Sequence, residues 1–353
     1  MIKIFTPSFA DESDTNAQNL TVKEVVARLD PEKFYVTMLA EAEPDPRIVA
    51  RPNTRLLHWR GHGNTIRTLL KCLRELPDVY FYPREGPLDA SFLKLRRTFE
   101  LKTAVLTHVV SGSMHLGTVP RTLTRNVREA DLVFGNCRYI SALLRERLGA
   151  EADTIHNGID RRFFFPEKEE EHRVGARPLR VFSASSFRAY KRMHLVIERA
   201  ATWPDVHFRI AGRGEEEERC RKLAHDLCCR NLDFLGHLTP QQLGEEMRCS
   251  DVFFHPSMLE GHPQVLGQAA ASGLPVVAMG MYRPDYVIDG QTGLLATSDE
   301  DLDRKLDLLL TQEELRKSMS KAAVEHAKGF NWDQITRQWE AALESAVARR
   351  RGN

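Results

Sequence analysis

The loop that holds Glu260 is the part of this sequence best suited to chemistry. It follows the short apolar run Val252–Phe254, which predicts a buried strand. It precedes Pro263–Ser272, which predicts a helix that begins with proline and ends at a glycine. Leu274–Ala278 predicts the next strand, so the loop falls at the carboxyl ends of two parallel strands, where open α/β sheets bind ligands. Glu260 therefore stands beside helix amides that favour an anion such as a diphosphate.

Two cations occupy a second loop of the same kind. Arg188 and Lys191 follow the predicted strand Leu179–Ala184 and precede a helix that runs through Ala200. Cations in a loop are ordinary surface residues by default. Their place after a strand and before a helix favours the binding of a diphosphate instead.

The elements that must position these loops alternate between strand and helix along the chain. Such alternation predicts an α/β fold with wound parallel sheets. Because 353 residues are too many for one ordinary core, two domains are expected. The predicted elements of the first domain are strands at Ile2–Phe5, Phe34–Leu39, Thr54–His58, Val79–Tyr82, Ala104–Val110 and Asp131–Phe134, and helices at Val22–Leu29, Asn64–Leu76 and Leu88–Leu101.

The residues around Glu260 resemble the hallmark of the family 4 glycosyltransferases. Pro256-Ser257, Glu260-Gly261 and Gly273-Leu274-Pro275-Val276 match the pattern of that family. The resemblance covers nearly the whole chain and is strongest from Leu179 to Trp332.

The resemblance implies the GT-B fold, in which two Rossmann-like domains with parallel sheets face each other across a cleft. The implied parts are an N-terminal acceptor-side domain (residues 1–165), a C-terminal domain that binds the nucleotide-sugar donor (166–330), and a terminal helix (331–353) that crosses back to the N-terminal domain.

The resemblance also implies the site residues. Glu260 is expected to orient hydroxyls of the donor sugar near the reacting carbon, and His108, near the end of a predicted strand, is expected to line the sugar site. Taken alone, a histidine beside apolar residues is more often a packed and hydrogen-bonded one, so with the resemblance both interpretations of His108 stay open. The expected donor-binding residues are Lys191, Arg188, Gly261, His262, Gln264, Val265, Gln268 and Arg283.

Two positions depart from the family pattern. Gln268 stands where the family has a second glutamate, which holds the ribose of the nucleotide, and Ser186 stands where it has an arginine. An amide cannot accept hydrogen bonds on two oxygens as a carboxylate does, which predicts donor binding weaker by roughly 1 to 3 kcal/mol. We hypothesise that Arg283 supplies part of the positive charge missing at Ser186.

By resemblance, the expected activity is that of a retaining, metal-independent glycosyltransferase of the hexosyl type. Its substrate is a nucleotide sugar, no cofactor is needed, and polysaccharide biosynthesis is the expected setting. The acceptor is an unidentified glycan, lipid or small molecule. These two departures, together with the segment Gly280–Asp285, which is one residue shorter than in the family and lacks its paired glycines, leave open a catalytically impaired binding or scaffold protein of the same fold. A sugar-nucleotide epimerase is a third alternative.

Other classes of function are argued against by the sequence. A net charge of +1 speaks against nucleic acid as a partner. The turn after the first strand lacks G-x-G-x-x-G, which speaks against a dehydrogenase. Asp301 and Asp303 form the nearest metal-like pair, but they fall at a predicted helix start, so no metal is expected. The first loop is polar, and its side chains can bind sugar hydroxyls or make turns and caps; they are Asp11, Asp14, Asn16 and Asn19.

Composition bears on where the protein works. Residues 51–150 carry 17 Lys/Arg against 8 Asp/Glu. The simplest explanation of this excess is a basic face that is exposed to solvent. Lys94, Arg96 and Arg97 on the predicted helix Leu88–Leu101 also allow peripheral contact with the inner face of a membrane. Six cysteines without a disulfide framework predict reduced core thiols in a cytoplasmic protein.

Overall fold

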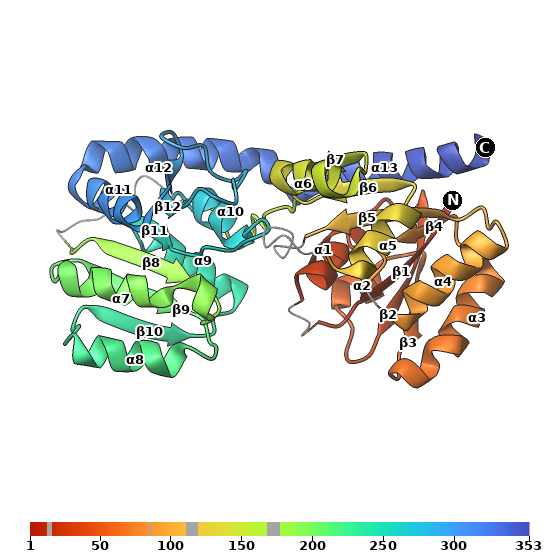
Figure 1. Cartoon of the computed structure of the whole chain (residues 1–353), viewed down its shortest axis with the longest axis horizontal. Coiled ribbons are helices and arrows are strands. Elements are labelled where there is room, and N and C mark those ends of the chain that lie inside the picture. The colour runs from red at the N-terminus through yellow and green to blue at the C-terminus, as the bar shows by residue number, and fades with distance from the viewer. Residues whose placement is uncertain (13–15, 85, 111–118, 168–176, 353) are drawn as a thin grey trace. The chain divides into compact units, whose positions relative to one another are not determined.

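Two compact units, each with its own sheet, make up the chain. The structure is a computed structural model, and it describes residues 1–12, 16–84, 86–110, 119–167 and 177–352 (Figure 1). Unit 1 consists of Met1–Asn157 and Trp332–Asn353, and unit 2 consists of Gly158–Asn331.

Seven parallel strands within the described ranges form the sheet of unit 1, in the order β3-β2-β1-β4-β5-β6-β7. Helices connect them, as parallel neighbours require. The strands are β1 (Ile2–Phe9), β2 (Phe34–Ala40), β3 (Thr54–His58), β4 (Val79–Phe81), β5 (Ala104–Val109), β6 (Leu132–Gly135) and β7 (Ala152–Thr154). The α-helices are α1 (Ala17–Val26), α2 (Pro46–Ala50), α3 (Thr65–Glu75), α4 (Pro87–Thr98), α5 (Arg121–Glu129), α6 (Arg138–Leu148) and α13 (Trp332–Gly352).

Side chains along β1 alternate between the two faces of this sheet, and different helices cover each face. Ile4 packs in a cluster with residues of α1, α2 and α13, whereas the next residue, Phe5, packs with residues of α3 and α4. Trp339 of α13 is fully buried, and its ring makes edge contacts with Phe81 and Phe134. The C-terminal helix is thus part of the core of unit 1.

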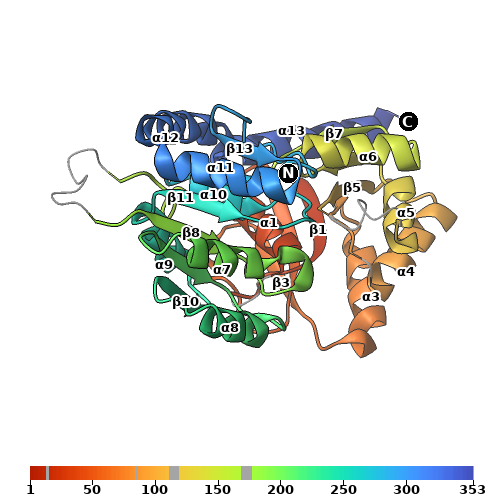
Figure 2. The ribbon, with the colours of Figure 1, turned by 60° about the vertical axis from the view of Figure 1, so that its left-hand side comes forward.

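Unit 2 repeats this architecture with six parallel strands in the part that the structure describes, in the order β10-β9-β8-β11-β12-β13. Four of these strands, β10, β8, β11 and β13, are labelled in Figure 2. The strands are β8 (Arg180–Ala184), β9 (His207–Ala211), β10 (Leu232–Gly236), β11 (Val252–His255), β12 (Val276–Met279) and β13 (Gly293–Ala296). The α-helices are α7 (Met193–Thr202), α8 (Glu217–Asp226), α9 (Pro240–Arg248), α10 (Gln264–Ala271), α11 (Asp299–Thr311) and α12 (Glu313–Ala327). The predicted fold class, α/β with two parallel-sheet domains, is confirmed.

The first helix lies earlier in the chain than predicted. β1 continues to Phe9, and α1 begins at Ala17 instead of Val22. The side chain of Asn16 accepts hydrogen bonds from the backbone N–H groups of Gln18 and Asn19, which caps the helix at this point. Apolar periodicity alone placed the start too late because the first turn of α1 is polar.

The polar side chains of this loop make turns and caps. Asp11 accepts hydrogen bonds from the backbone N–H groups of Glu41 and Ala42, at 2.9 and 3.1 Å, and Asn19 accepts one from Phe9 at 3.1 Å. Asp14 lies outside the described residues. Nothing about these contacts favours a sugar-binding role.

The cysteines are free, but not all are core thiols as predicted. Cys72, Cys137 and Cys220 are buried, whereas Cys228 and Cys249 are exposed. Cys228 adopts a left-handed backbone conformation after the end of α8, and such ends lie at the surface. The prediction of core thiols is therefore wrong for these two residues.

A glycine turn after β9 supports the loop that follows β8. The backbone N–H of Phe187 donates to the carbonyl oxygen of Arg213 at 2.8 Å, and that of Ser185 donates to Ala211 at 3.1 Å. A Cβ atom on Gly212 would lie 1.8 Å from the carbonyl oxygen of Ser185. The loop can approach this turn so closely only because the side chain is absent.

We expect Gly212→Ala to lower the free energy of unfolding by about 3 kcal/mol or more, because the new methyl group overlaps backbone atoms that cannot move aside cheaply. Gly290→Ala is the matched control: its φ of +75° is also left-handed, but no atom lies within 4 Å of the added Cβ. Its cost should be about 1 to 2 kcal/mol. Urea unfolding of both variants measures the difference, and equal costs would contradict the close approach.

Candidate active site

The two loops singled out in the sequence leave neighbouring strands at the centre of the sheet of unit 2. β8 pairs with β9 on one side and with β11 on the other, so the order of the strands reverses between β8 and β11. Loops that follow such neighbours diverge and leave a crevice at the carboxyl edge, which is where ligands of these sheets bind. The loops are bonded to each other, since the backbone N–H of Met258 donates to the carbonyl oxygen of Tyr190 at 3.0 Å.

Glu260 and Lys191 meet at this edge. Lys191 Nζ lies 2.5 Å from Glu260 Oε1, and His255 Nε2 lies 2.8 Å from the same oxygen. Because a carboxylate only accepts, His255 must carry its proton on Nε2. No described residue bonds the other oxygen, Oε2, which leaves it available to a hydroxyl donor. Side-chain exposure is 10% for Glu260 and 14% for Lys191, so the pair is mostly shielded from water.

The environment of Glu260 keeps its carboxylate charged. Burial by itself raises the pKa, but the hydrogen bond and charge of His255, followed by those of Lys191, outweigh it and lower the pKa to about 2. At neutral pH the side chain is therefore an ion that accepts hydrogen bonds and cannot donate a proton.

Arg192 and Tyr282 pack around this cluster, and sequence reasoning missed both of them. Arg192 Nε donates to the carbonyl oxygen of Pro256 at 2.8 Å, and its Nη1 lies 2.5 Å from Asp299 Oδ1. This arginine thereby joins the two loops and the start of α11. Tyr282 is fully buried, and its hydroxyl has no partner among the described residues. Burial and then the charge of Glu260 raise its pKa well above the usual value, so it keeps its proton.

The start of α10 adds backbone N–H groups to the same loop. The helix begins at Gln264, directly after Pro263, and no side chain caps it. Its first amides are therefore able to hydrogen-bond an anion. Gln268 stands one turn after Gln264 and is half-buried, and no described residue bonds its amide.

The other predicted donor-binding residues differ in exposure. His262 is buried and stacks on the ring of Tyr286, with centroids 3.9 Å apart, so it supports the loop rather than facing outward. Arg188 and Arg283 are exposed, and Arg283 adopts a left-handed φ of 43°. Val265 is half-buried in the first turn of α10, and Gly261 precedes that turn. All of these predicted residues lie on the loops or helix of one edge of unit 2.

His108 belongs to unit 1 and has the geometry of a packed histidine. It is 3% exposed, and its ring makes edge contacts with Tyr82 and Trp339. Nε2 lies 2.9 Å from the carbonyl oxygen of Ile155 and must donate to it. Burial lowers the pKa to about 4, so the ring is neutral at pH 7. Nδ1 has no partner in the described part of the chain, and the predicted catalytic role of His108 stays a prediction.

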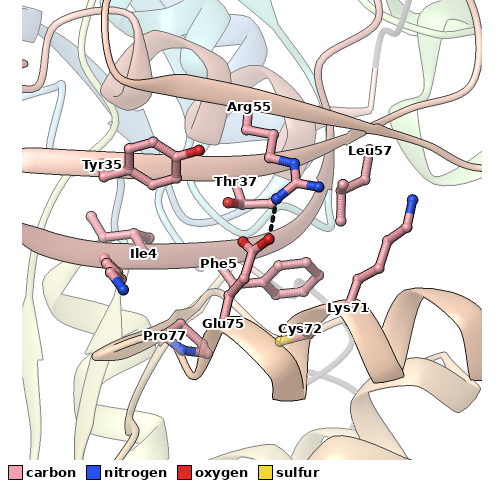
Figure 3. Close-up of a pocket in the computed structure, with 11 residues that line it drawn as sticks. Ile4, Phe5, Tyr35, Thr37, Arg55, Leu57, Lys71, Cys72, Glu75 and Pro77 are labelled. Carbon is pink, nitrogen blue, oxygen red and sulfur yellow. Dashed lines mark hydrogen bonds and ion pairs between the residues drawn. The ribbon is translucent and has the colours of Figure 1, made fainter.

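A pocket in unit 1 lies away from the ligand-binding edge of its sheet. It has a volume of about 220 Å³ and is bounded by the early residues of β1 and β2 and by the last turn of α3. Phe5, Leu57 and Cys72 line its apolar part, and the ion pair between Arg55 and Glu75 crosses it (Figure 3). Because it lies toward the amino ends of the strands, we do not assign the substrate to it.

Neither a metal-binding cluster nor a membrane-spanning helix is found among the described residues. No three His, Cys, Asp or Glu side chains gather there in an arrangement fit for a metal ion. Asp301 instead accepts hydrogen bonds from Thr297 and pairs with Lys305, as charge at the start of α11. None of the described helices is sufficiently long and apolar to span a membrane.

Comparison with known proteins identifies a matching family model and relatives of this chain. Residues 164–326 match the family model described as glycosyl transferases group 1. An uncharacterized glycosyltransferase of Methanocaldococcus jannaschii is 26% identical over 58% of this chain and 56% of its own length. The D-inositol 3-phosphate glycosyltransferase of Corynebacterium aurimucosum is 34% identical over 41% of this chain and 37% of its own length. The chain thus spans about half the length, or less, of these curated relatives.

Solved structures share the fold of both units. Sucrose-phosphate synthase from Thermosynechococcus elongatus superposes with a TM-score of 0.79 over 99% of this chain and 100% of its own, at 18% identity. HepE of Anabaena, solved with UDP and glucose, gives a TM-score of 0.76 over 98% and 100% of the two chains, at 16% identity. Both are glycosyltransferases of the GT-B fold, so the predicted fold is confirmed, while the low identity shows the fold alone.

The low pKa of Glu260 predicts a specific loss of stability in acid. Because the folded-state pKa of about 2 lies below the ordinary 4.5, the stabilisation is complete above pH 4.5 and is lost as the pH falls toward 2. We expect the unfolding temperature of Glu260→Gln to fall less than that of the wild type as the pH is lowered from 4.5 toward 2.

Asp226→Asn, which removes an exposed acid, is the control and should leave the profile unchanged. His255→Gln should shift the loss to higher pH, because the main group that lowers the pKa is gone. Parallel profiles for the wild type and Glu260→Gln would show that the carboxylate is not held as an ion.

Proposed function

Because residues 164–326 match the family model of group 1 glycosyl transferases, we propose that the protein transfers a hexosyl group from a nucleotide sugar to an acceptor. The transfer proceeds with retention at the anomeric carbon and without a metal ion. The observation that carries the proposal is the contact between Lys191 and Glu260 at the strand reversal of unit 2, beside the uncapped start of α10.

The first need of this reaction is to stabilise the departing diphosphate. Lys191 has three N–H donors, and Glu260 uses only one of them, so two remain for phosphate oxygens. Arg188 is exposed in the same loop, and the free amides of α10 add donors with the positive end of a helix dipole. These groups can offset the charge of a leaving diphosphate, which is the basis for proposing a metal-independent reaction.

The second need is to hold the sugar so that its anomeric carbon is exposed to the acceptor. Glu260 is an ion at neutral pH, with Oε1 fixed by His255 and Lys191 and with Oε2 available. It can accept a hydrogen bond from a hydroxyl of the donor sugar. A carboxylate that is held in place by two partners positions that hydroxyl without rearranging.

The nucleotide is proposed from a structural neighbour. HepE of Anabaena was solved with UDP-glucose, so uridine diphosphate sugars are the first donors to test. The acceptor is a glycan, a lipid or a small molecule, and the cytoplasm is the proposed location.

We expect UDP-glucose to raise the unfolding temperature of the wild type, because a ligand that binds only the folded state stabilises it. Lys191→Ala should lower the affinity about tenfold or more, since one partner of the diphosphate is lost. Arg283→Ala tests the compensation hypothesis and should weaken binding less than Lys191→Ala. Lys222→Ala, on α8, is a control for the loss of a surface cation.

Turnover separates the alternatives. Slow hydrolysis of the bound nucleotide sugar, abolished by Glu260→Ala, supports a transferase. Binding without any turnover would favour a scaffold protein, and an isomerised nucleotide sugar formed without acceptor would favour an epimerase. If none of a panel of nucleotide sugars shifts the unfolding temperature, the proposed function is wrong.

The amide at position 268 offers a test by gain of function. If Gln268 faces the ribose, Gln268→Glu restores an acceptor for two hydroxyls and should tighten nucleotide binding about tenfold, within the roughly 1 to 3 kcal/mol assigned to such a bond. Gln291→Glu adds the same charge at an exposed turn and should have no effect. Isothermal titration with the nucleoside diphosphate measures both, and weaker binding by Gln268→Glu would place the residue elsewhere than at the ribose.

A further inference from the structure

The outer face of α3 in unit 1 combines exposed apolar side chains with cations. Ile66 is 72% exposed and Leu70 is 61% exposed, one helical turn apart. Arg67, Lys71 and Arg74 flank them on the same face and are also exposed. A shallow groove of about 570 Å³ lies on this face and is lined by these five side chains together with Gly63 and Asn64.

The fold of unit 1 does not need this face. The opposite side of α3 buries Thr68 and Cys72, and Cys72 packs against the sheet with Phe92 of α4. No described residue forms a hydrogen bond or ion pair with the side chains of Arg67, Lys71 or Arg74. The cations are therefore available, and the exposed Ile66 and Leu70 contribute nothing to the core.

We propose that this face of α3 binds the surface of a membrane that contains anionic lipids. An amphipathic helix binds such a surface when apolar side chains enter the headgroup boundary and cations meet the anionic lipids. Ile66 and Leu70 supply the first contribution, and the three cations supply the second. Glu75, the last residue of α3, pairs with Arg55, and the segment from Arg60 to Arg74 holds four Arg or Lys and no Asp or Glu.

The combination favours a lipid surface over other anionic partners. A nucleic acid or an acidic protein would be bound by the cations alone and would gain little from two exposed aliphatic side chains. A second copy of α3 would bring like charges together.

The helix that the sequence favoured for this role, Leu88–Leu101, is less suitable. Its counterpart in the structure is α4, where Arg96 turns inward, pairs with Asp131 at 2.6 Å and donates to the carbonyl oxygen of Thr103. Lys94 and Arg97 remain at the surface, but Arg97 already pairs with Glu129. We therefore assign the proposed membrane contact to α3 and not to α4.

The experiment is co-sedimentation of the full chain with vesicles. We expect binding to phosphatidylcholine vesicles that contain phosphatidylglycerol, weaker binding as salt is added, and little binding to pure phosphatidylcholine. The double variant Ile66→Ser/Leu70→Ser should reduce binding to the anionic vesicles about tenfold, because the inserted apolar area is lost. The triple variant Arg67→Gln/Lys71→Gln/Arg74→Gln should reduce it at least as much.

Val49→Ser is the matched control. Val49 is an equally exposed aliphatic residue, 60% exposed, but it lies on α2, which packs on the other face of the sheet through Ile48. The Val49→Ser variant should bind anionic vesicles as well as the wild type does. Circular dichroism of every variant shows whether it is folded.

The proposal is overturned if the wild type does not bind anionic vesicles, if it binds both kinds of vesicle equally, or if the double variant binds as well as the wild type. In the last case the face recognises charge alone, and competition by RNA would then identify a polyanion as the partner. None of these outcomes depends on the nucleotide sugar, so the proposed function stands or falls separately.

Discussion

The site in unit 2 depends on one buried carboxylate that is kept charged. Removing Glu260 from water disfavours its ionised form, and only the two groups on Oε1, His255 and Lys191, reverse that preference. The three side chains come from the end of β11, from the loop after it and from the loop after β8. Any change that separates these two loops therefore leaves the buried carboxylate of Glu260 without its partners. The charge of Glu260 thus depends on the geometry of the sheet edge.

The topology of the sheet makes that geometry possible. β8 and β11 are neighbours in the sheet although about seventy residues of the chain separate the residues that pair between them, such as Val181 and Val252. The same holds for Lys191 and Glu260 in the loops that follow. The glycine turn at Gly212 holds the first loop from one side, and Arg192 joins it to the second. The loop that carries Lys191 is thus held from both sides, and the contact with Glu260 restricts the lysine side chain itself, so less conformational freedom remains to be lost when it binds a ligand.

Much of the fold could be predicted because strands and helices alternate with proline and glycine at their ends, as Pro263 and Gly273 do for α10. The loops of Glu260 and Lys191 could be predicted for the same reason. His255 could not, because it continues an apolar run and shows no local signal of its partner. Arg192 and Tyr282 were missed since their contacts are long-range. His108 was left between two interpretations, and its packing in unit 1 became visible only with Tyr82 and Trp339 in place.

The two departures from the family pattern offset each other electrostatically. If both positions line the donor site, Gln268 removes one negative charge relative to the family pattern and Ser186 removes one positive charge, so these two changes cancel in net charge. A diphosphate is attracted by the sum of nearby charges more than by any one of them. The departures should therefore change which hydroxyls of the donor are bound, through the hydrogen bonds lost, more than the overall attraction for an anionic leaving group. On this argument the altered residues would change donor selectivity, while Glu260 and Lys191, on which the proposed transfer depends, are present and in contact.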